Sequence, residues 1–179
     1  QASPTLVEER TADISAPVFT TGYPYFTGVR GTSALINFDL DEISKVYFVL
    51  VPASASAPTK SEVMSLTASG GADATACGVV DVSSQVAGTT RFSATRNVTS
   101  VTDAVMSSST CEDSAFYGLS GESAMKCSSC VQLSESTAYK VYFVAEDDES
   151  TAAYYRSNNA MSTPDVEDLT TADNQPPTS

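Results

Sequence analysis

The sequence predicts an all-β fold built as one domain, and two patterns carry that prediction. Segment 33–40 has an apolar residue at every second position from Ala34 to Leu40, which is the period of a strand with one buried face. Segment 45–51, Lys-Val-Tyr-Phe-Val-Leu-Val, is rich in β-branched and aromatic residues and stops at Pro52. Such a run is typical of a central strand covered on both faces.

The first elements follow from these two segments. Because only the acidic turn Asp41-Glu42 separates them, we expect 33–40 and 45–51 to pair as a hairpin. Upstream, segments 18–20 and 23–26 predict a first strand that Gly22 and Pro24 interrupt, which a sheet tolerates only at its edge.

A second copy of the central strand lies near the other end of the chain. Lys140–Val144 repeats Lys45–Val49 residue for residue, and we expect the two copies to be neighbouring central strands. The polar stretch 146–150 then predicts a hairpin turn, and 152–156 predicts the last strand.

The long middle stretch, residues 53–130, is harder to interpret. Thr59 followed three residues later by Glu62 predicts a capped short helix, which the glycine-rich turn 69–71 ends. Apolar residues within 79–82 and 90–94 predict further strands. Residues 101–130 are too rich in serine to assign.

The pattern Leu133-x3-Thr137-x-Tyr139, continued by alternating apolar residues to Ala145, resembles the sixth strand of fibronectin type III and immunoglobulin-like domains. The resemblance implies that the leucine packs at a corner and that the tyrosine hydroxyl bonds to backbone upstream. It implies an immunoglobulin-like or fibronectin III-like β-sandwich over residues 17–162, with a large disulfide-containing insertion at about 53–130. The passage from Lys45 through Val63 also resembles immunoglobulin-like repeats of large microbial and algal cell-surface proteins.

The charge of the chain excludes some partners. A formal net charge of −13 disfavours nucleic acid and anionic membrane surfaces, both of which need clustered Lys and Arg. No apolar run reaches the roughly 20 residues that span a bilayer, and we see no leader peptide, so we expect no membrane insertion. Few charged residues and many hydroxyls suit an extracellular surface.

Four cysteines, an even number, predict two disulfides and a secreted, extracellular protein. They are Cys77, Cys111, Cys127 and Cys130, and three pairings remain open. The Cys127-x-x-Cys130 pair could instead be redox-active or bind a metal, but no βαβ pattern surrounds it and the chain has no histidine. Asn97-Val98-Thr99 is an acceptor for N-glycosylation.

Several catalytic classes are excluded by composition. Without histidine, Ser-His-Asp and Cys-His mechanisms are impossible, and no glycine-rich phosphate loop is present. A carboxylate pair remains, but the carboxylates concentrate in turns, where solvation explains them. We therefore expect that the chain is not an enzyme.

The acidic turns also suggest calcium. In a sandwich, three acidic segments would meet at one end, as in calcium-bridged junctions of cadherin-like arrays. The candidate ligands are Glu8, Glu9, Asp13, Asp39, Asp41, Glu42, Asp147, Asp148 and Glu149. The alternative is that these turns are simply polar and need no ion.

Tyrosines and a phenylalanine near both ends of the domain allow two interpretations. Tyr23, Tyr25, Phe26, Tyr154 and Tyr155 either form an exposed strip for sugars or partners or close the core, as such residues more often do.

An acidic, proline-ended motif appears at both borders of the chain. Residues 7–13 with Pro17 return as 166–173 with Pro176 and Pro177. We therefore expect linkers at 1–16 and 163–179 and a non-catalytic structural or adhesive repeat module of an extracellular fibre, wall or cell-surface glycoprotein. Its partners would be neighbouring copies and, in addition, glycans. The alternatives are a carbohydrate-binding module of a larger secreted protein, or a subunit that polymerises by donating its tail as a strand.

Overall fold

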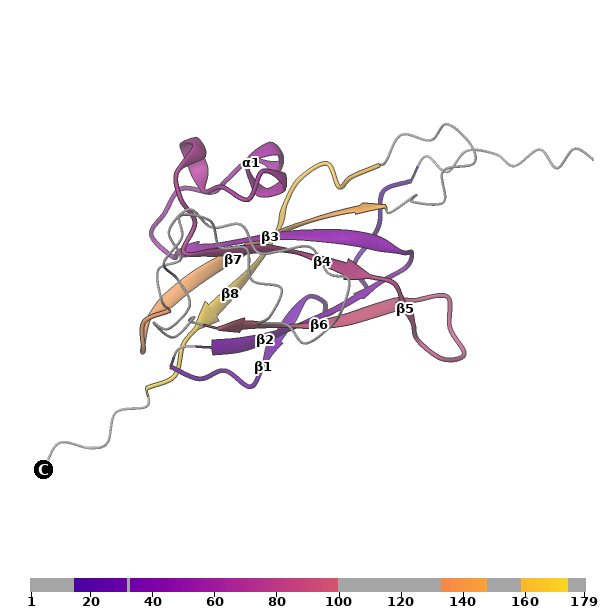
Figure 1. Cartoon of the computed structure of the whole chain (residues 1–179), viewed down its shortest axis with the longest axis horizontal. Coiled ribbons are helices and arrows are strands. Elements are labelled where there is room, and N and C mark those ends of the chain that lie inside the picture. Colours follow the sequence, from indigo (N-terminus) through magenta and orange to yellow (C-terminus); the bar gives the residue numbers. More distant parts are fainter. Residues whose placement is uncertain (1–14, 32, 100–132, 148–158, 174–179) are drawn as a thin grey trace, which may run out of the picture.

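The computed structural model describes residues 15–31, 33–99, 133–147 and 159–173 as two antiparallel sheets with very little helix. The strands are β1 (Tyr25–Thr27), β2 (Ser33–Leu40), β3 (Ser44–Pro52), β4 (Ala76–Val82), β5 (Ser84–Gln85), β6 (Phe92–Thr99), β7 (Ala138–Asp147) and β8 (Asp165–Thr170). One sheet has the order β1-β2-β6-β5 and the other β4-β3-β7-β8. The sheets lie face to face, and the short helix α1 (Lys60–Met64) covers the second of them (Figure 1). The all-β prediction is confirmed.

The main core fills the space between the sheets. β2 contributes its alternating residues from Ala34 to Leu40, and the facing sheet contributes Phe48 and Phe143 among others. The rings of Phe38 and Phe143 meet edge to face at 5.8 Å. The two-residue period of β2 therefore has the role predicted for it.

The two copies of Lys-Val-Tyr-Phe-Val are neighbours, as predicted. β3 and β7 pair antiparallel with Phe48 opposite Phe143, so the Tyr-Phe-Val parts of the two repeated pentapeptides pair with each other. In both copies the Val-x-Phe residues face the main core. Their other faces meet a second apolar cluster formed with α1, in which Val49, Val144 and Val63 are fully buried. β3 is thus covered on both faces.

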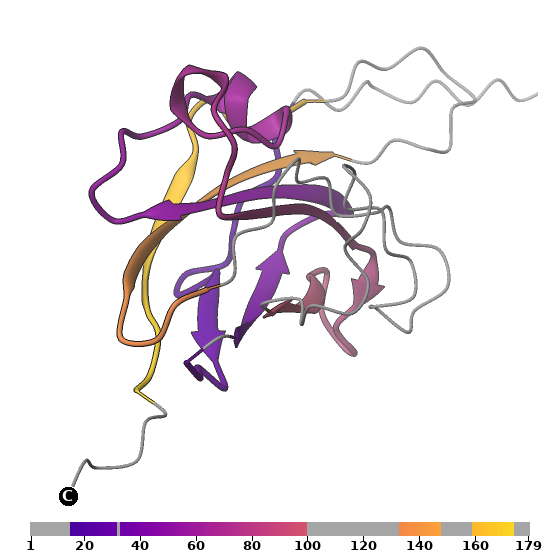
Figure 2. The same cartoon turned by 60° about the vertical axis from the view of Figure 1, so that its left-hand side comes forward.

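The predicted hairpin between 33–40 and 45–51 is wrong. β2 pairs with β1 and β6, whereas β3 pairs with β4 and β7, so residues 41–43 cross from one sheet to the other. The crossing lets both strands turn their alternating apolar residues to the same core from opposite sides. Figure 2 shows the two sheets separating on either side of this connection.

The predicted linker at 163–179 and the predicted insertion at 53–130 need correction. Residues 165–170 form β8, the edge strand beside β7, where Leu169 is buried and only 2% exposed. Residues 76–82 and 92–99 are integral strands of the two sheets. The part of the proposed insertion at 100–130 and the predicted last strand at 152–156 lie outside the described residues.

Two local predictions hold. Thr59 caps α1, its side chain accepting from the Glu62 amide, while Glu62 accepts in return from the Thr59 amide at 2.7 Å. Near the start of β7, the Tyr139 hydroxyl accepts a hydrogen bond from the Ser134 amide at 2.8 Å, and Leu133 is buried in the core beside it. The expected return of the tyrosine hydroxyl to upstream backbone is therefore present.

Candidate functional site

The acidic residues predicted to meet at one end do so where they are described. The turn after β2 carries Asp41 and Glu42, and Ser44, which starts β3, lies opposite Asp147, which ends β7. The N-terminal segment enters at the same end, because Phe19 bridges to Leu40. Antiparallel pairing thus places these segments together, as the sandwich topology requires.

Each described carboxylate at this end already has partners in the chain. Asp39 is 3% exposed, accepts from the Thr20 hydroxyl and forms an ion pair with Arg91 at 3.3 Å. Asp41 accepts from the Val18 amide at 2.8 Å. These bonds tie the N-terminal segment and the β5–β6 region to the end of β2.

Asp147 is equally enclosed. It is 3% exposed and accepts from both the backbone amide and the side-chain amide of Asn159, the latter at 3.2 Å. The Asp147 amide in turn donates to the Asn159 carbonyl at 3.0 Å. The carboxylate therefore fastens the chain that returns toward β8.

No calcium site can be built from the part of the chain that the structure describes, because it contains no group of three or more Asp, Glu, Cys or His residues able to hold a metal ion. Five of the nine predicted ligands lie outside the described residues: Glu8, Glu9, Asp13, Asp148 and Glu149. The carboxylates of Asp39, Asp41 and Asp147 act in hydrogen bonds and an ion pair within the fold, and Glu42 accepts from the Ser44 hydroxyl through its backbone carbonyl. A calcium site here stays a prediction.

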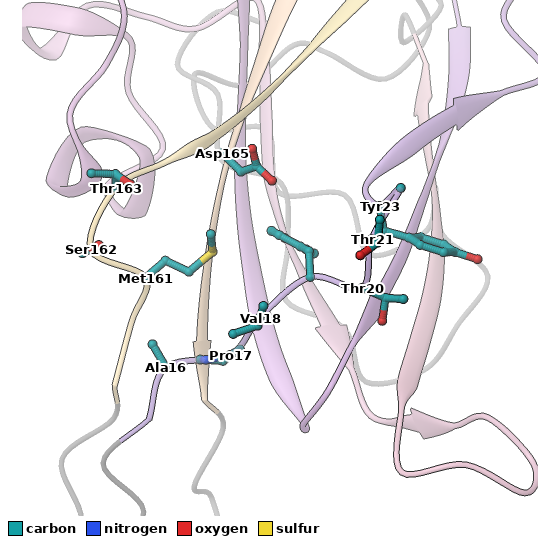
Figure 3. Close-up of a pocket in the computed structure, with 12 residues that line it drawn as sticks. Ala16, Pro17, Val18, Thr20, Thr21, Tyr23, Met161, Ser162, Thr163 and Asp165 are labelled. Atoms are coloured by element: carbon teal, nitrogen blue, oxygen red, sulfur yellow. The ribbon is translucent and has the colours of Figure 1, made fainter.

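A shallow pocket opens beside these residues, with a volume of ≈ 370 Å³. One wall is the N-terminal segment 16–23 and the other is segment 161–165, which leads into β8 (Figure 3). Val18 and Met161 supply apolar surface, and Asp165 brings a carboxylate. The lining has neither a nucleophile with a base nor a set of metal ligands, so its chemistry is that of a contact surface.

The aromatic residues at the N-terminus divide between the two interpretations. Phe26 packs on the core, whereas Tyr25 is 40% exposed. Tyr23 meets Tyr25 edge to face at 4.9 Å, and burial, with the neighbouring Tyr25 and Asp39, raises the pKa of the Tyr23 hydroxyl. Tyr154 and Tyr155 lie outside the described residues. Among the described residues, the predicted exposed strip therefore contains only the pair Tyr23 and Tyr25.

The outer face of the β1-β2-β6-β5 sheet carries a polar row that sequence reasoning missed. The Asn37 side-chain amide donates to the Thr27 hydroxyl at 2.9 Å and to the Tyr25 carbonyl at 3.3 Å, and it accepts from the Thr95 hydroxyl at 3.1 Å. The signal was present, because Asn37 occupies the polar phase of the alternating strand β2.

The predicted glycosylation site and one cysteine fall within strands. Asn97 lies in β6, where its backbone pairs opposite Leu35 of β2. Cys77 lies in β4, fully buried in the cluster beneath α1. The other three cysteines, Cys111, Cys127 and Cys130, lie outside the described residues, so the disulfide pairing stays open.

No protein-family model, curated protein or solved structure matches this chain. Among the described residues, no helix is long and apolar enough to cross a membrane. The function must therefore be inferred from the fold and from the arrangement of its ends.

Proposed function

We propose that this chain is an immunoglobulin-like or fibronectin III-like module that acts as a non-catalytic structural or adhesive repeat unit of an extracellular fibre, wall or cell-surface glycoprotein. Its partners are neighbouring copies of the same module. The proposal has a fold part and a functional part, which different observations support.

The strand order supports the fold part. In immunoglobulin-like domains one sheet has the order A-B-E-D and the other contains C-F-G, with further strands added beside C. Naming the strands here in chain order gives β1-β2-β6-β5 as A-B-E-D and β4-β3-β7-β8 as C′-C-F-G. The Tyr139 hydroxyl bond at the start of β7 matches the tyrosine corner that precedes strand F in that family.

The positions of the two chain ends carry the functional part. The N-terminal segment enters beside Leu40, where β2 ends, and the C-terminal segment leaves beside Arg30, just before β2 begins. The length of β2, eight residues or about 26 Å, separates these points. The views agree that the described chain ends at opposite ends of the molecule (Figure 1, Figure 2).

Opposite ends and a motif repeated at both borders suit modules strung in series. In such a string each copy transmits tension from one junction to the next through its hydrogen-bonded strands. The C-terminal strand β8 runs along β7 and is held by Leu169 in the core. Tension pulling on the C-terminus would therefore act along the strand against all of its hydrogen bonds at once.

The tail-donation alternative is less favoured by this arrangement. Residues 165–170 fill the edge of their own sheet beside β7, so the described part of the tail is already paired within the chain. The carbohydrate-binding alternative keeps one supporting observation, which is the exposed Tyr25 ring next to the amide and hydroxyls around Asn37. Aromatic rings beside such polar groups suit sugar recognition.

Mass spectrometry of unreduced peptides from the native source tests the proposal. A peptide that contains Pro177 and continues into another strand-rich copy would support the repeat array. Peptides that end at Ser179 in every preparation would contradict it. A screen of soluble oligosaccharides against the full chain, with Tyr25→Ala as the matched variant, tests the carbohydrate alternative, and a loss of binding in the variant would favour it.

A further inference from the structure

The C-terminal strand β8 belongs to the motif that the chain repeats. Aligned without gaps at a spacing of 160 positions, residues 3–17 and 163–177 share five identical residues. These pairs are Pro4 with Pro164, Thr11 with Thr171, Ala12 with Ala172, Asp13 with Asp173 and Pro17 with Pro177. Leu6 also aligns with Val166, and Glu8 with Asp168. The structure describes residues 163–173 of the second copy, and their contacts show what this motif does in the fold.

Thr171 joins the end of β8 to the turn before β7 through buried hydrogen bonds. It is 3% exposed, and its hydroxyl donates to the Ser134 carbonyl at 2.6 Å and accepts from the Thr137 amide at 2.9 Å. Its own amide donates to the Thr137 carbonyl at 3.0 Å. A buried hydroxyl needs such partners, so this position fits the turn before β7 specifically.

Ala172 also connects the end of β8 to the segment that precedes β2 in the other sheet. Its amide donates to the Arg30 carbonyl at 3.2 Å, and its carbonyl accepts from the Ser136 amide at 3.3 Å. The shared Thr-Ala-Asp sequence is therefore the stretch that hydrogen-bonds the end of β8 to two turns. In the first copy of the motif, Pro17 is the shared residue that is described, and it is buried where the chain first enters the fold.

Building on the proposed array, we propose that residues 3–13 are the last strand of a preceding copy of the module, equivalent to residues 163–173. The module then runs from residue 14 to residue 173. The junction between copies contains three residues, 14–16, instead of the long linkers that composition suggested. Three residues span at most about 11 Å, so consecutive copies lie in contact.

The surface at the entry point fits such a neighbour. Val18 is 60% exposed and Ile43 is 43% exposed, and both lie beside Asp41, whose side chain bonds the Val18 amide. The described residues contain only four exposed large apolar side chains, and two of them are found here. A second copy held within about 11 Å would cover them.

One core position differs between the two segments. Leu169, which is buried in the core, aligns with Glu9. The preceding copy is therefore a variant of this module and not a duplicate. A direct exchange of the two segments would put a carboxylate at this core position, so the exchanged segment carries Glu9→Leu.

The test replaces residues 163–173 of the full chain with the sequence of residues 3–13 carrying Glu9→Leu. The control replaces them with Gly and Ser over the same length. Hydrogen exchange at the β7 amides is the main readout, because β8 pairs directly with β7. We expect the exchanged chain to keep β7 protection within about tenfold of the native chain, whereas the Gly/Ser control loses at least about a hundredfold.

Matched substitutions in the exchanged chain sharpen the result. Within the transplanted segment, Thr11→Val should lower the melting temperature as Thr171→Val does in the native chain. Arg10→Val, which aligns with the exposed Thr170, should leave it nearly unchanged. Protection as low as in the Gly/Ser control, or equal effects of the two substitutions, would overturn the proposal. The array itself is judged separately, by the peptides from native material, so the two failures can be told apart.

Discussion

The outer faces of the two sheets differ although both sheets share one core. On the β4-β3-β7-β8 sheet, Val49, Val51 and Val144 are fully or almost fully buried beneath the segment that contains α1. On the other sheet, the outer face carries the hydrogen-bonded row centred on Asn37. The difference follows from the sequence pattern, since β3 is apolar at consecutive positions, whereas the outward positions of β2 include the polar residues Ser33 and Asn37 beside Leu35. The apolar pattern of a strand thus determines whether its outer face must be covered by a further layer.

The largest expected effect tests the covered face against the polar face. Val144→Asp places an unpaired carboxylate where the side chain is now 0% exposed, and we expect a loss of more than about 4 kcal/mol in the free energy of unfolding. Thr95→Asp, at an exposed position of the polar face, should change it by about 0.5 kcal/mol or less. Denaturant titration measures both, and similar losses would show that the two faces do not differ as described.

Removing apolar contact from the covering helix tests how firmly it holds. Val63 is fully buried in α1 against the sheet, so Val63→Ala should cost about 2 kcal/mol in the free energy of unfolding. Ser61→Ala on the exposed side of the same helix is the control. If the two variants unfold at the same denaturant concentration, α1 contributes little to the buried face.

A smaller, pH-dependent effect concerns the cap of that helix. Hydrogen bonds from the Thr59 amide, the Thr59 hydroxyl and the Gly70 amide lower the pKa of Glu62. A lowered pKa in the folded state contributes stability above the ordinary glutamate pKa of about 4.3, and this contribution is lost as pH falls through the folded value. Melting curves should therefore show Glu62→Gln less stable than the native chain at pH 7, with the gap closing in acid. A gap that is constant with pH would contradict this.

The smallest effect is expected on the polar face. Asn37→Ala removes three hydrogen bonds that lie near solvent, and we expect a loss of about 1 kcal/mol or less, because water replaces the partners. Thermal unfolding measures it, with Thr27→Ala as the variant that removes one of the three. A loss as large as that of Val63→Ala would mean that the row stabilises the sheet as strongly as an apolar cover.

Patterns of local origin were read correctly from the sequence. The alternation in β2, the apolar run of β3, its repeat in β7 and the Thr59–Glu62 capping box depend on neighbours in the chain, and each is present. Strand pairing was harder to predict. Closeness in sequence does not decide whether residues 41–43 form a hairpin turn within one sheet or cross from one sheet to the other. The sequence predicts a linker where β8 lies, because an edge strand needs few buried side chains and Leu169 is the only fully buried residue of β8.

The predicted acidic cluster shows the same limit. The topology that brings Asp39, Asp41 and Asp147 to one end could be inferred from the sandwich, but their partners could not. Arg91 and Asn159 are distant in sequence from the carboxylates that they contact. The sequence therefore predicts the end of the sandwich at which the acidic residues gather. Only the fold shows that the described carboxylates bond to other segments of the chain.

The pairing of the two Tyr-Phe-Val copies with each other has a consequence for folding. A strand that pairs with its own sequence, Phe48 opposite Phe143, can form the same pairing with either copy in another unfolded chain. Within one module the correct pair must form across nearly a hundred residues, which is slow compared with local contacts. Within β3 and β7, Lys45, Lys140 and Pro52 flank the apolar runs as charged and proline residues that oppose aggregation. In a string of such modules, tethering raises the local concentration of competing strands, so synthesis and folding of one module before the next would protect the chain from misassembly.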